Sequence, residues 1–99
     1  MTIYYFDIDN TITKTKDGDY PNAKPIKNRI NKINKLAQKG HKIVMCTARG
    51  AESGIDWIPF TKQQLDEWGV QYHEIARKPY YDLLIDDHAT NAENYFNGN

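Results

Sequence analysis

The stretch YYFDIDNTIT, residues 4–13, places two aspartates at the end of the first hydrophobic segment of the chain. The run from Ile3 to Ile8 predicts a buried β-strand, and Asp7 and Asp9 close it with one residue between them. Repulsion between like charges and loss of hydration both disfavour two carboxylates at such a position. The pair therefore indicates a functional site at the end of this strand.

The chain has 99 residues, which predicts one domain spanning 1–99. Its apolar content of 39% and charged content of 26% are typical of a globular protein. No apolar run is long enough to span a bilayer, and no segment resembles a signal peptide, so we expect a cytoplasmic protein without a membrane partner. The single cysteine, Cys46, agrees with a reducing compartment.

The net charge is zero, but the charges are unevenly distributed. Nine basic and two acidic residues lie between Lys14 and Lys42, and four basic and nine acidic residues follow from Ile43 onward. The basic stretch either attracts polyanionic partners or solvates an exposed helix. No aromatic residues alternate with these basic residues in the way that favours stacking of nucleic-acid bases.

Apolar runs alternate with helical patterns along the rest of the chain. The predicted strands after the first are 43–46, 70–75 and 81–85. The predicted helices are 25–39, one opening at the capping box Thr61–Gln64, and one opening at the capping box Thr90–Glu93. An Asp-Gly pair in 16–20 predicts a small hairpin turn. This order predicts an α/β fold, a three-layer sandwich around a parallel Rossmann-like sheet.

Polar residues follow the predicted strands where each strand ends. In a parallel α/β sheet, ligands bind beyond these carboxyl ends. Clustered carboxylates imply a cation, and few carboxylates with hard oxygen ligands favour Mg²⁺ beside a substrate phosphate. A hydroxyl and an ammonium are suited to holding phosphate oxygens. The residues concerned are Asp7, Asp9, Thr47, Lys78, Asp86 and Asp87.

A carboxylate at such a site can attack phosphorus and form an aspartyl phosphate that water later hydrolyses. A second acid two residues further on faces the same side and can transfer the proton. At this point the motifs resemble those of haloacid dehalogenase superfamily phosphatases: DIDNT, the Thr47 of VMCTARG, Lys78-Pro79 and LLIDD occur in the family's order. The resemblance covers residues 3 to 96.

The resemblance implies a role for each matching residue. Asp7 is expected to be the nucleophile and a Mg²⁺ ligand, and Asp9 the general acid/base with its carbonyl also on the metal. Asp87 is expected to bind the metal directly and Asp86 through water, or the reverse. Thr47 and Lys78 are expected to hold the phosphoryl group. Further substrate-binding residues are Asn10, Ala48 and Arg49, and Arg49 is equally suited to pairing with a carboxylate.

More narrowly, the chain resembles small phosphatases of capsule and surface-polysaccharide biosynthesis, for which a sugar phosphate is the expected substrate. Only 31 positions separate Thr47 from Lys78, so no cap domain is expected. Selectivity then depends on residues 17–20, on the loop 49–60 with Trp57, or on a neighbouring subunit of a homo-oligomer acting as a lid. Alternatives are a phosphatase of nucleotide or nucleic-acid ends and a non-catalytic or receiver-like phosphoryl-binding module.

Overall fold

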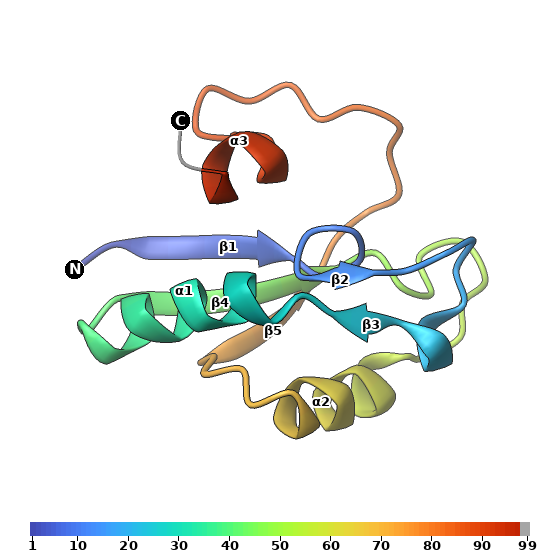
Figure 1. Cartoon of the computed structure of the whole chain (residues 1–99). Coiled ribbons are helices and arrows are strands. Elements are labelled where there is room, and N and C mark those ends of the chain that lie inside the picture. Colours follow the sequence, from blue (N-terminus) through green and yellow to red (C-terminus); the bar gives the residue numbers. More distant parts are fainter. Residues whose placement is uncertain (98–99) are drawn as a thin grey trace.

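The computed structural model describes residues 1–97, and its centre is a parallel sheet of three strands in the order β1–β4–β5 (Figure 1). These strands are β1 (Ile3–Asp7), β4 (Lys42–Thr47) and β5 (Glu74–Arg77). The parallel sheet confirms the predicted α/β Rossmann-like class, and the described part of the chain contains no cap domain. All three strands therefore end at the same edge of the sheet.

Three helices pack against one face of this sheet. They are α1 (Lys27–Gln38), α2 (Ile58–Glu67) and α3 (Ala92–Phe96). Each contributes side chains to one buried cluster, which also contains Phe6, Ile43 and Met45 from the strands. Because side chains alternate along a strand, Ile3 and Tyr5 lie on the opposite face, where they are 55% and 65% exposed. Within residues 1–97 that face carries no helix.

The predicted helix 25–39 is confirmed as α1, which ends before Gly40 at a φ of 90°. Pro25 is not in its first turn, because Pro25 pairs with Thr13 in a small antiparallel ladder of β2 (Thr13–Lys14) and β3 (Lys24–Pro25). The predicted Asp-Gly turn forms between these strands. Asp17 and Gly18 lie outside the ladder, and both have positive φ. A short 3-10 helix, η1 (Tyr20–Asn22), follows it.

Both predicted capping boxes are wrong in detail. Helix α2 begins at Ile58 with Pro59 in its first turn, so Thr61 lies inside the helix and is fully buried. Helix α3 takes Asn91 as its N-cap, and the Asn91 Oδ1 accepts a hydrogen bond from the backbone N–H of Glu93 at 2.8 Å. None of the helices within residues 1–97 has the length and hydropathy that a membrane span requires.

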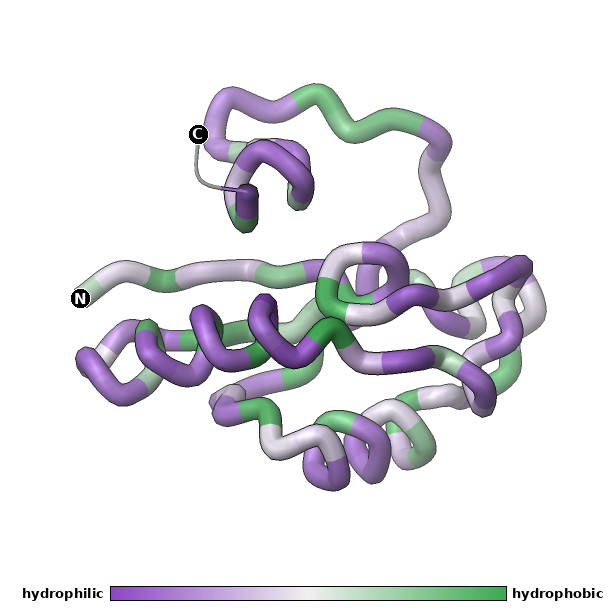
Figure 2. The backbone as a smooth tube through the Cα atoms, viewed as in Figure 1, coloured by the Kyte–Doolittle hydropathy of each residue, from purple (hydrophilic) through white to green (hydrophobic). Residues whose placement is uncertain are grey.

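The predicted fourth strand, 81–85, is also wrong. Residues 78–91 form no regular structure and arch away from the sheet before α3 (Figure 1). The green stretch at the top of Figure 2 is the hydrophobic part of this arch. Leu83, Leu84 and Ile85 are 75%, 52% and 89% exposed. The predicted third strand, 70–75, forms as β5, which begins four residues later than predicted and ends two residues later.

Candidate functional site

Asp7 ends β1 at the edge of the sheet where β4 and β5 also end. The Lys78 ammonium lies 3.3 Å from the Asp7 Oδ1, and the Thr11 hydroxyl donates to the Asp7 Oδ2 at 3.4 Å. Burial raises the pKa of Asp7, although the Lys78 charge acts in the opposite direction. Contacts with Tyr81 and Asp7 raise the pKa of Lys78 against the effect of its own burial. The pair therefore places a carboxylate beside a lysine that stays charged at neutral pH.

Asp9 lies at the same edge but has a different partner. The Arg49 Nε and Nη2 donate to the Asp9 Oδ2 and Oδ1, both at 2.8 Å. The Thr15 hydroxyl donates to the Asp9 Oδ1 at 2.7 Å. Such a two-point contact between a guanidinium and a carboxylate is stronger than a single hydrogen bond and fixes the orientation of both groups. Asp7 and Asp9 are thus neighbours in sequence with separate cationic partners.

Arg49 is buried in the centre of a hydrogen-bond network. Its side chain is 0% exposed, and its Nη1 donates to the Thr61 Oγ1 at 3.1 Å and the Gln64 Oε1 at 2.6 Å. The guanidinium carbon lies 4.5 Å from the centroid of the Tyr20 ring. The Gln64 amide also donates to the Tyr20 carbonyl at 2.7 Å. Arg49 therefore ties Asp9 to α2 and η1, which agrees with the predicted pairing with a carboxylate.

Thr47 and Lys78 are held together by the backbone. The Lys78 N–H donates to the Thr47 carbonyl at 2.8 Å, which extends the β4–β5 pairing by one residue. The Thr47 Oγ1 accepts from the Arg49 N–H at 3.0 Å, so its own hydroxyl proton remains available to a ligand. The two predicted phosphate-holding residues therefore lie at one edge with Asp7.

Asn10 and Ala48, two of the predicted substrate-binding residues, differ in their surroundings. Asn10 has a φ of 61°, a conformation that Asn tolerates better than most residues and that Gly adopts without strain. Its N–H donates to the Thr13 hydroxyl at 3.3 Å, so this backbone group is already engaged within the chain. Ala48 is exposed, and its carbonyl accepts from the Ala51 N–H at 2.9 Å.

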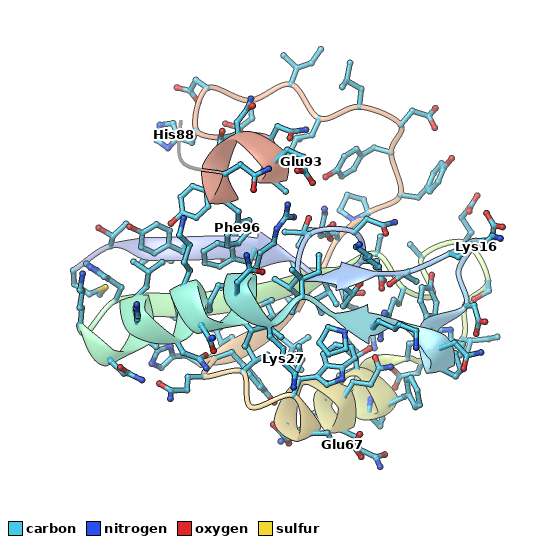
Figure 3. The ribbon with its side chains drawn as sticks, viewed as in Figure 1. Lys16, Lys27, Glu67, His88, Glu93 and Phe96 are labelled. Carbon is cyan, nitrogen blue, oxygen red and sulfur yellow. The ribbon has the colours of Figure 1, made fainter. Side chains whose placement is uncertain are left out.

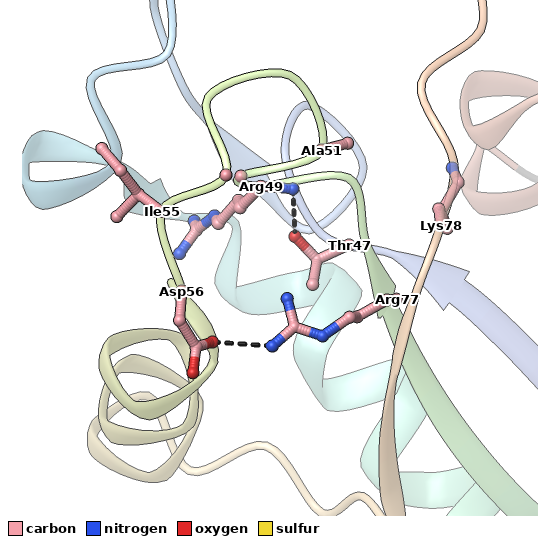
Figure 4. Close-up of a pocket in the computed structure, with 9 residues that line it drawn as sticks. Thr47, Arg49, Ala51, Ile55, Asp56, Arg77 and Lys78 are labelled. Carbon is pink, nitrogen blue, oxygen red and sulfur yellow. Dashed lines mark hydrogen bonds and ion pairs between the residues drawn. The ribbon is translucent and has the colours of Figure 1, made fainter.

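An open cleft of about 400 Å³ adjoins Thr47 and Lys78 (Figure 4). The loop between β4 and α2 forms one wall, and the end of β5 forms the other. Across the cleft, the Arg77 Nη2 donates to the Asp56 Oδ1 at 2.7 Å. Gly50, at a φ of 83°, keeps the loop folded, because a Cβ there would collide with the Ile55 carbonyl. Trp57 packs edge-on against Tyr20 with ring centroids 5.0 Å apart.

Asp86 and Asp87 are not brought to this edge. The Asp86 Oδ1 accepts from the His88 N–H at 2.8 Å, and the Asp87 side chain is 90% exposed beside His88. Figure 3 shows His88 near α3, on the arch that leaves the sheet. Within residues 1–97 no three acidic, histidine or cysteine side chains gather as a metal site. Of the residues predicted as metal ligands, only Asp7 and Asp9 lie together.

The network around Arg49 was the part of the site that sequence reasoning missed. The sequence predicts Thr61 and Gln64 as a helix cap, yet both side chains are hydrogen-bonded to Arg49. Pro59 was the available signal for an earlier helix start, because proline favours the first turn. A start at 58 puts positions 61 and 64 one turn apart on one helix face, where both side chains reach Arg49.

The comparisons with known proteins bear on the fold as a whole. No family model and no curated protein sequence matches the chain. A crystal structure of a structural-genomics target from Vibrio cholerae is 31% identical in sequence to this chain. The match covers 100% of this chain and 90% of the Vibrio cholerae chain, with a TM-score of 0.85.

A second solved structure is D,D-heptose 1,7-bisphosphate phosphatase from B. bronchiseptica, complexed with magnesium and phosphate. It is 18% identical with a TM-score of 0.61, over 90% of this chain and 54% of that protein, which shows the fold alone. The chain therefore belongs to the family of the Vibrio cholerae protein and has the fold of haloacid dehalogenase-type phosphatases.

Proposed function

We propose that this protein is a phosphatase that hydrolyses phosphate monoesters through an aspartyl-phosphate intermediate. The observation that carries the proposal is the Asp7 carboxylate, 3.3 Å from the Lys78 ammonium, at the edge where Thr47 lines an open cleft. A phosphoryl group in that cleft meets a nucleophile, a fixed positive charge and a hydroxyl donor. The fold shared with a known phosphatase supports the same reaction class.

In the first step an Asp7 oxygen attacks phosphorus and forms the aspartyl phosphate, while the bond from phosphorus to the leaving oxygen breaks. The leaving oxygen takes a proton from the Asp9 carboxyl group. In the second step Asp9 accepts a proton from water as that water attacks phosphorus, which releases phosphate and restores Asp7. Lys78 and Thr47 hold the phosphoryl oxygens throughout.

Proton transfer by Asp9 requires a change in its contacts. Both of its carboxylate oxygens accept from Arg49, so both are engaged in this arrangement. One oxygen has to leave the guanidinium before it donates to a leaving group. The Arg49 Nη1 retains its contacts with Thr61 and Gln64 during such a shift, which keeps the guanidinium in place.

We also propose Mg²⁺ as the cofactor. The donor set of one chain fits this ion only in part: the Asp7 carboxylate and the Asp9 carbonyl are hard oxygen donors, and within residues 1–97 no hydrogen bond engages that carbonyl. The missing donors are the Asp86 or Asp87 carboxylates, which lie on the arch. When bound, the ion would offset the negative charge of the phosphate and of the two aspartates.

The proposed substrate is a small sugar phosphate. A cleft of about 400 Å³ is within the size range of small-ligand sites, and Arg77 with Asp56 offers both donors and acceptors to hydroxyl groups. D,D-heptose 1,7-bisphosphate phosphatase, which shares the fold, acts on a sugar phosphate by its name. The resemblance to surface-polysaccharide phosphatases points the same way.

A nucleotide or nucleic-acid end is the second candidate. The excess of basic residues between Lys14 and Lys42, together with the open cleft, favours it. A 3′-phosphorylated oligonucleotide hydrolysed with higher kcat/KM than every sugar phosphate would select this candidate. Falling activity with rising salt would accompany it, because phosphate contacts release counterions.

The test is phosphate release from a panel of sugar phosphates, nucleotides and an aryl phosphate, with Mg²⁺ and with chelator. We expect turnover that depends on Mg²⁺ and is lost in Asp7→Asn. Trapping of ³²P on the wild-type chain at acid quench, and none on Asp7→Asn, would identify the nucleophile. Absence of turnover on every substrate together with absence of Mg²⁺ binding would reject the proposal.

A further inference from the structure

The arch between β5 and α3 exposes an unusual amount of hydrophobic surface. Tyr80, Leu83, Leu84 and Ile85 are all more than half exposed and lie within six residues. Contiguous exposed hydrophobic residues of this kind mark interaction surfaces in folded proteins. The same arch carries the two acidic residues that the metal site lacks.

A matching surface lies at the outer edge of β1. Within residues 1–97, β1 pairs with β4 alone in the sheet order β1–β4–β5, so its other edge offers unpaired backbone N–H and carbonyl groups. Ile3 and Tyr5 are exposed on the face without helices. A further strand at this edge would satisfy the backbone groups and cover part of these side chains.

The chain's own arch is too short to supply that strand in the useful direction. A strand parallel to β1 that ends beside Asp7 has to begin at the opposite end of the sheet. Measured from the end of β5, this starting point lies about 14 Å away across three strand spacings and about 17 Å back along the strand direction. The direct distance is roughly 22 Å. From Arg77, where β5 ends, to Tyr81 is four residue steps, which span at most about 14 Å.

We propose that a second copy of this chain supplies the strand: its residues 81–85 lie parallel to the free edge of β1, and its acidic pair reaches Asp7. The register that sets Leu83 of the partner beside Tyr5 also sets the partner's Ile85 beside Asp7. The partner's Asp87 then lies level with Asp9, at the edge where the metal donors are missing. The exchange is reciprocal, which gives a closed dimer.

The charge of the arch suits the site that it reaches. Residues 79–97 contain four carboxylates and no lysine or arginine. Lys78 also lies at the site that receives the partner's acids. The pairing of the two copies stands on the exposed surfaces and the reach of the chain; the role of the acids in it rests on the proposed function.

The first test measures association without any assay of activity. Sedimentation velocity of the wild-type chain at about 50 µM should show a dimer. A Leu83→Glu/Ile85→Glu double variant should be monomeric with an unchanged circular dichroism spectrum, because both side chains are exposed in one chain. Ile55→Glu, at an apolar position outside the arch that is 57% exposed, should remain dimeric. A monomeric wild type, or a dimeric double variant, would overturn the proposal.

The second test asks whether the site is shared between copies. Asp7→Asn and Asp86→Asn/Asp87→Asn chains should each be inactive, and two differently tagged chains coexpressed and purified as a mixed dimer should regain half of the wild-type activity per dimer. One site of the mixed dimer then has an intact Asp7 and an intact acidic pair. No recovery in the mixed dimer, or full activity of Asp86→Asn/Asp87→Asn alone, would overturn the proposal. A wild type that hydrolyses nothing would reject the proposed function, and sedimentation alone would then decide the pairing.

Discussion

Arg49 donates through its Nε and Nη2 to both carboxylate oxygens of Asp9, at 2.8 Å each, while its side chain is fully buried. Replacement of Arg49 by Met should lower the free energy of unfolding by about 3 kcal/mol, because a half-buried carboxylate and the Gln64 carbonyl lose their donor. Urea denaturation measures this change. Arg77→Met, which breaks an exposed pair with Asp56, is the matched control and should change stability much less, because exposed ion pairs contribute little.

Arg49→Lys should separate orientation from charge. A lysine keeps the positive charge but cannot contact both Asp9 oxygens in the plane of the carboxylate. We expect kcat to fall more than tenfold with KM changed less than threefold, because Asp9 contacts the leaving oxygen only during reaction. Steady-state kinetics on the best substrate of the panel would show this. An unchanged kcat with a raised KM would instead place Arg49 on the substrate.

Asp7→Asn should raise the melting temperature at neutral pH while it abolishes turnover. Burial raises the pKa of Asp7, so the folded state favours the protonated form and ionised Asp7 opposes folding. That cost is absent below the unfolded pKa of an aspartate and develops as the pH rises through the folded pKa. The difference in melting temperature between Asp7→Asn and the wild type should therefore grow from about pH 3 to pH 7.

Asp66→Asn provides a control of opposite sign. The hydrogen bond from Lys62 holds the pKa of Asp66 below its usual value, so its ionised form supports folding. Asp66→Asn should melt slightly lower at neutral pH, and the difference should vanish as the pH falls through the folded pKa of Asp66. Equal melting changes of one sign in both variants would contradict the assigned shifts.

Gly50→Ala should destabilise the loop beside the cleft more than Gly54→Ala. Both glycines have positive φ, at 83° and 77°, so both substitutions cost about 1 kcal/mol of backbone strain. Only at position 50 does the new Cβ collide with a backbone carbonyl, that of Ile55. We expect a larger drop in melting temperature and a raised KM for Gly50→Ala. Equal effects of the two substitutions would show that the backbone at Ile55 shifts to accommodate the new Cβ at little cost.

Cys46 should be chemically inert in the folded protein. Burial raises the pKa of its thiol to about 11, and the Sγ donates to the Phe6 carbonyl at 3.4 Å. Since the thiolate is the reactive form, modification by a thiol reagent at pH 8 should be slow and should accelerate at least tenfold in denaturant. The release of chromophore from a disulfide reagent measures the rate. Fast labelling of the native chain would show that this strand opens.

The sequence predicted the strand ends well, because each is marked by a change from apolar to polar residues. Asp7, Thr47 and Lys78 lie at one edge as the pattern required. The fourth strand failed for a reason of chain length. The apolar run 81–85 satisfies a strand pattern, but Lys78 is anchored at the carboxyl edge by the Thr47 carbonyl. Only three residue steps separate Lys78 from Tyr81, so the same chain cannot return to the opposite end of the sheet, where a parallel strand has to begin.

The hydrogen-bond network of Arg49 could not be predicted from the sequence pattern, for a different reason. The motif of Thr followed three residues later by Gln is shared by helix caps and by helix interiors that face a buried polar group. Periodicity does not separate the two, because Thr61 and Gln64 lie on one face in either case. Only the position of the Arg49 side chain, which depends on packing across 15 residues of chain, decides between them.

The pair formed by Arg77 and Asp56 joins the two walls of the cleft, with side chains that are 59% and 62% exposed. An ion pair so accessible to water weakens as dissolved ions screen it, over a Debye length of about 8 Å at physiological ionic strength. The width of the cleft mouth is therefore coupled to the salt content of the medium. A bulky ester should gain more in kcat/KM from added potassium chloride than a compact one, so the substrate range of the protein is a property of its surroundings as well as of its sequence.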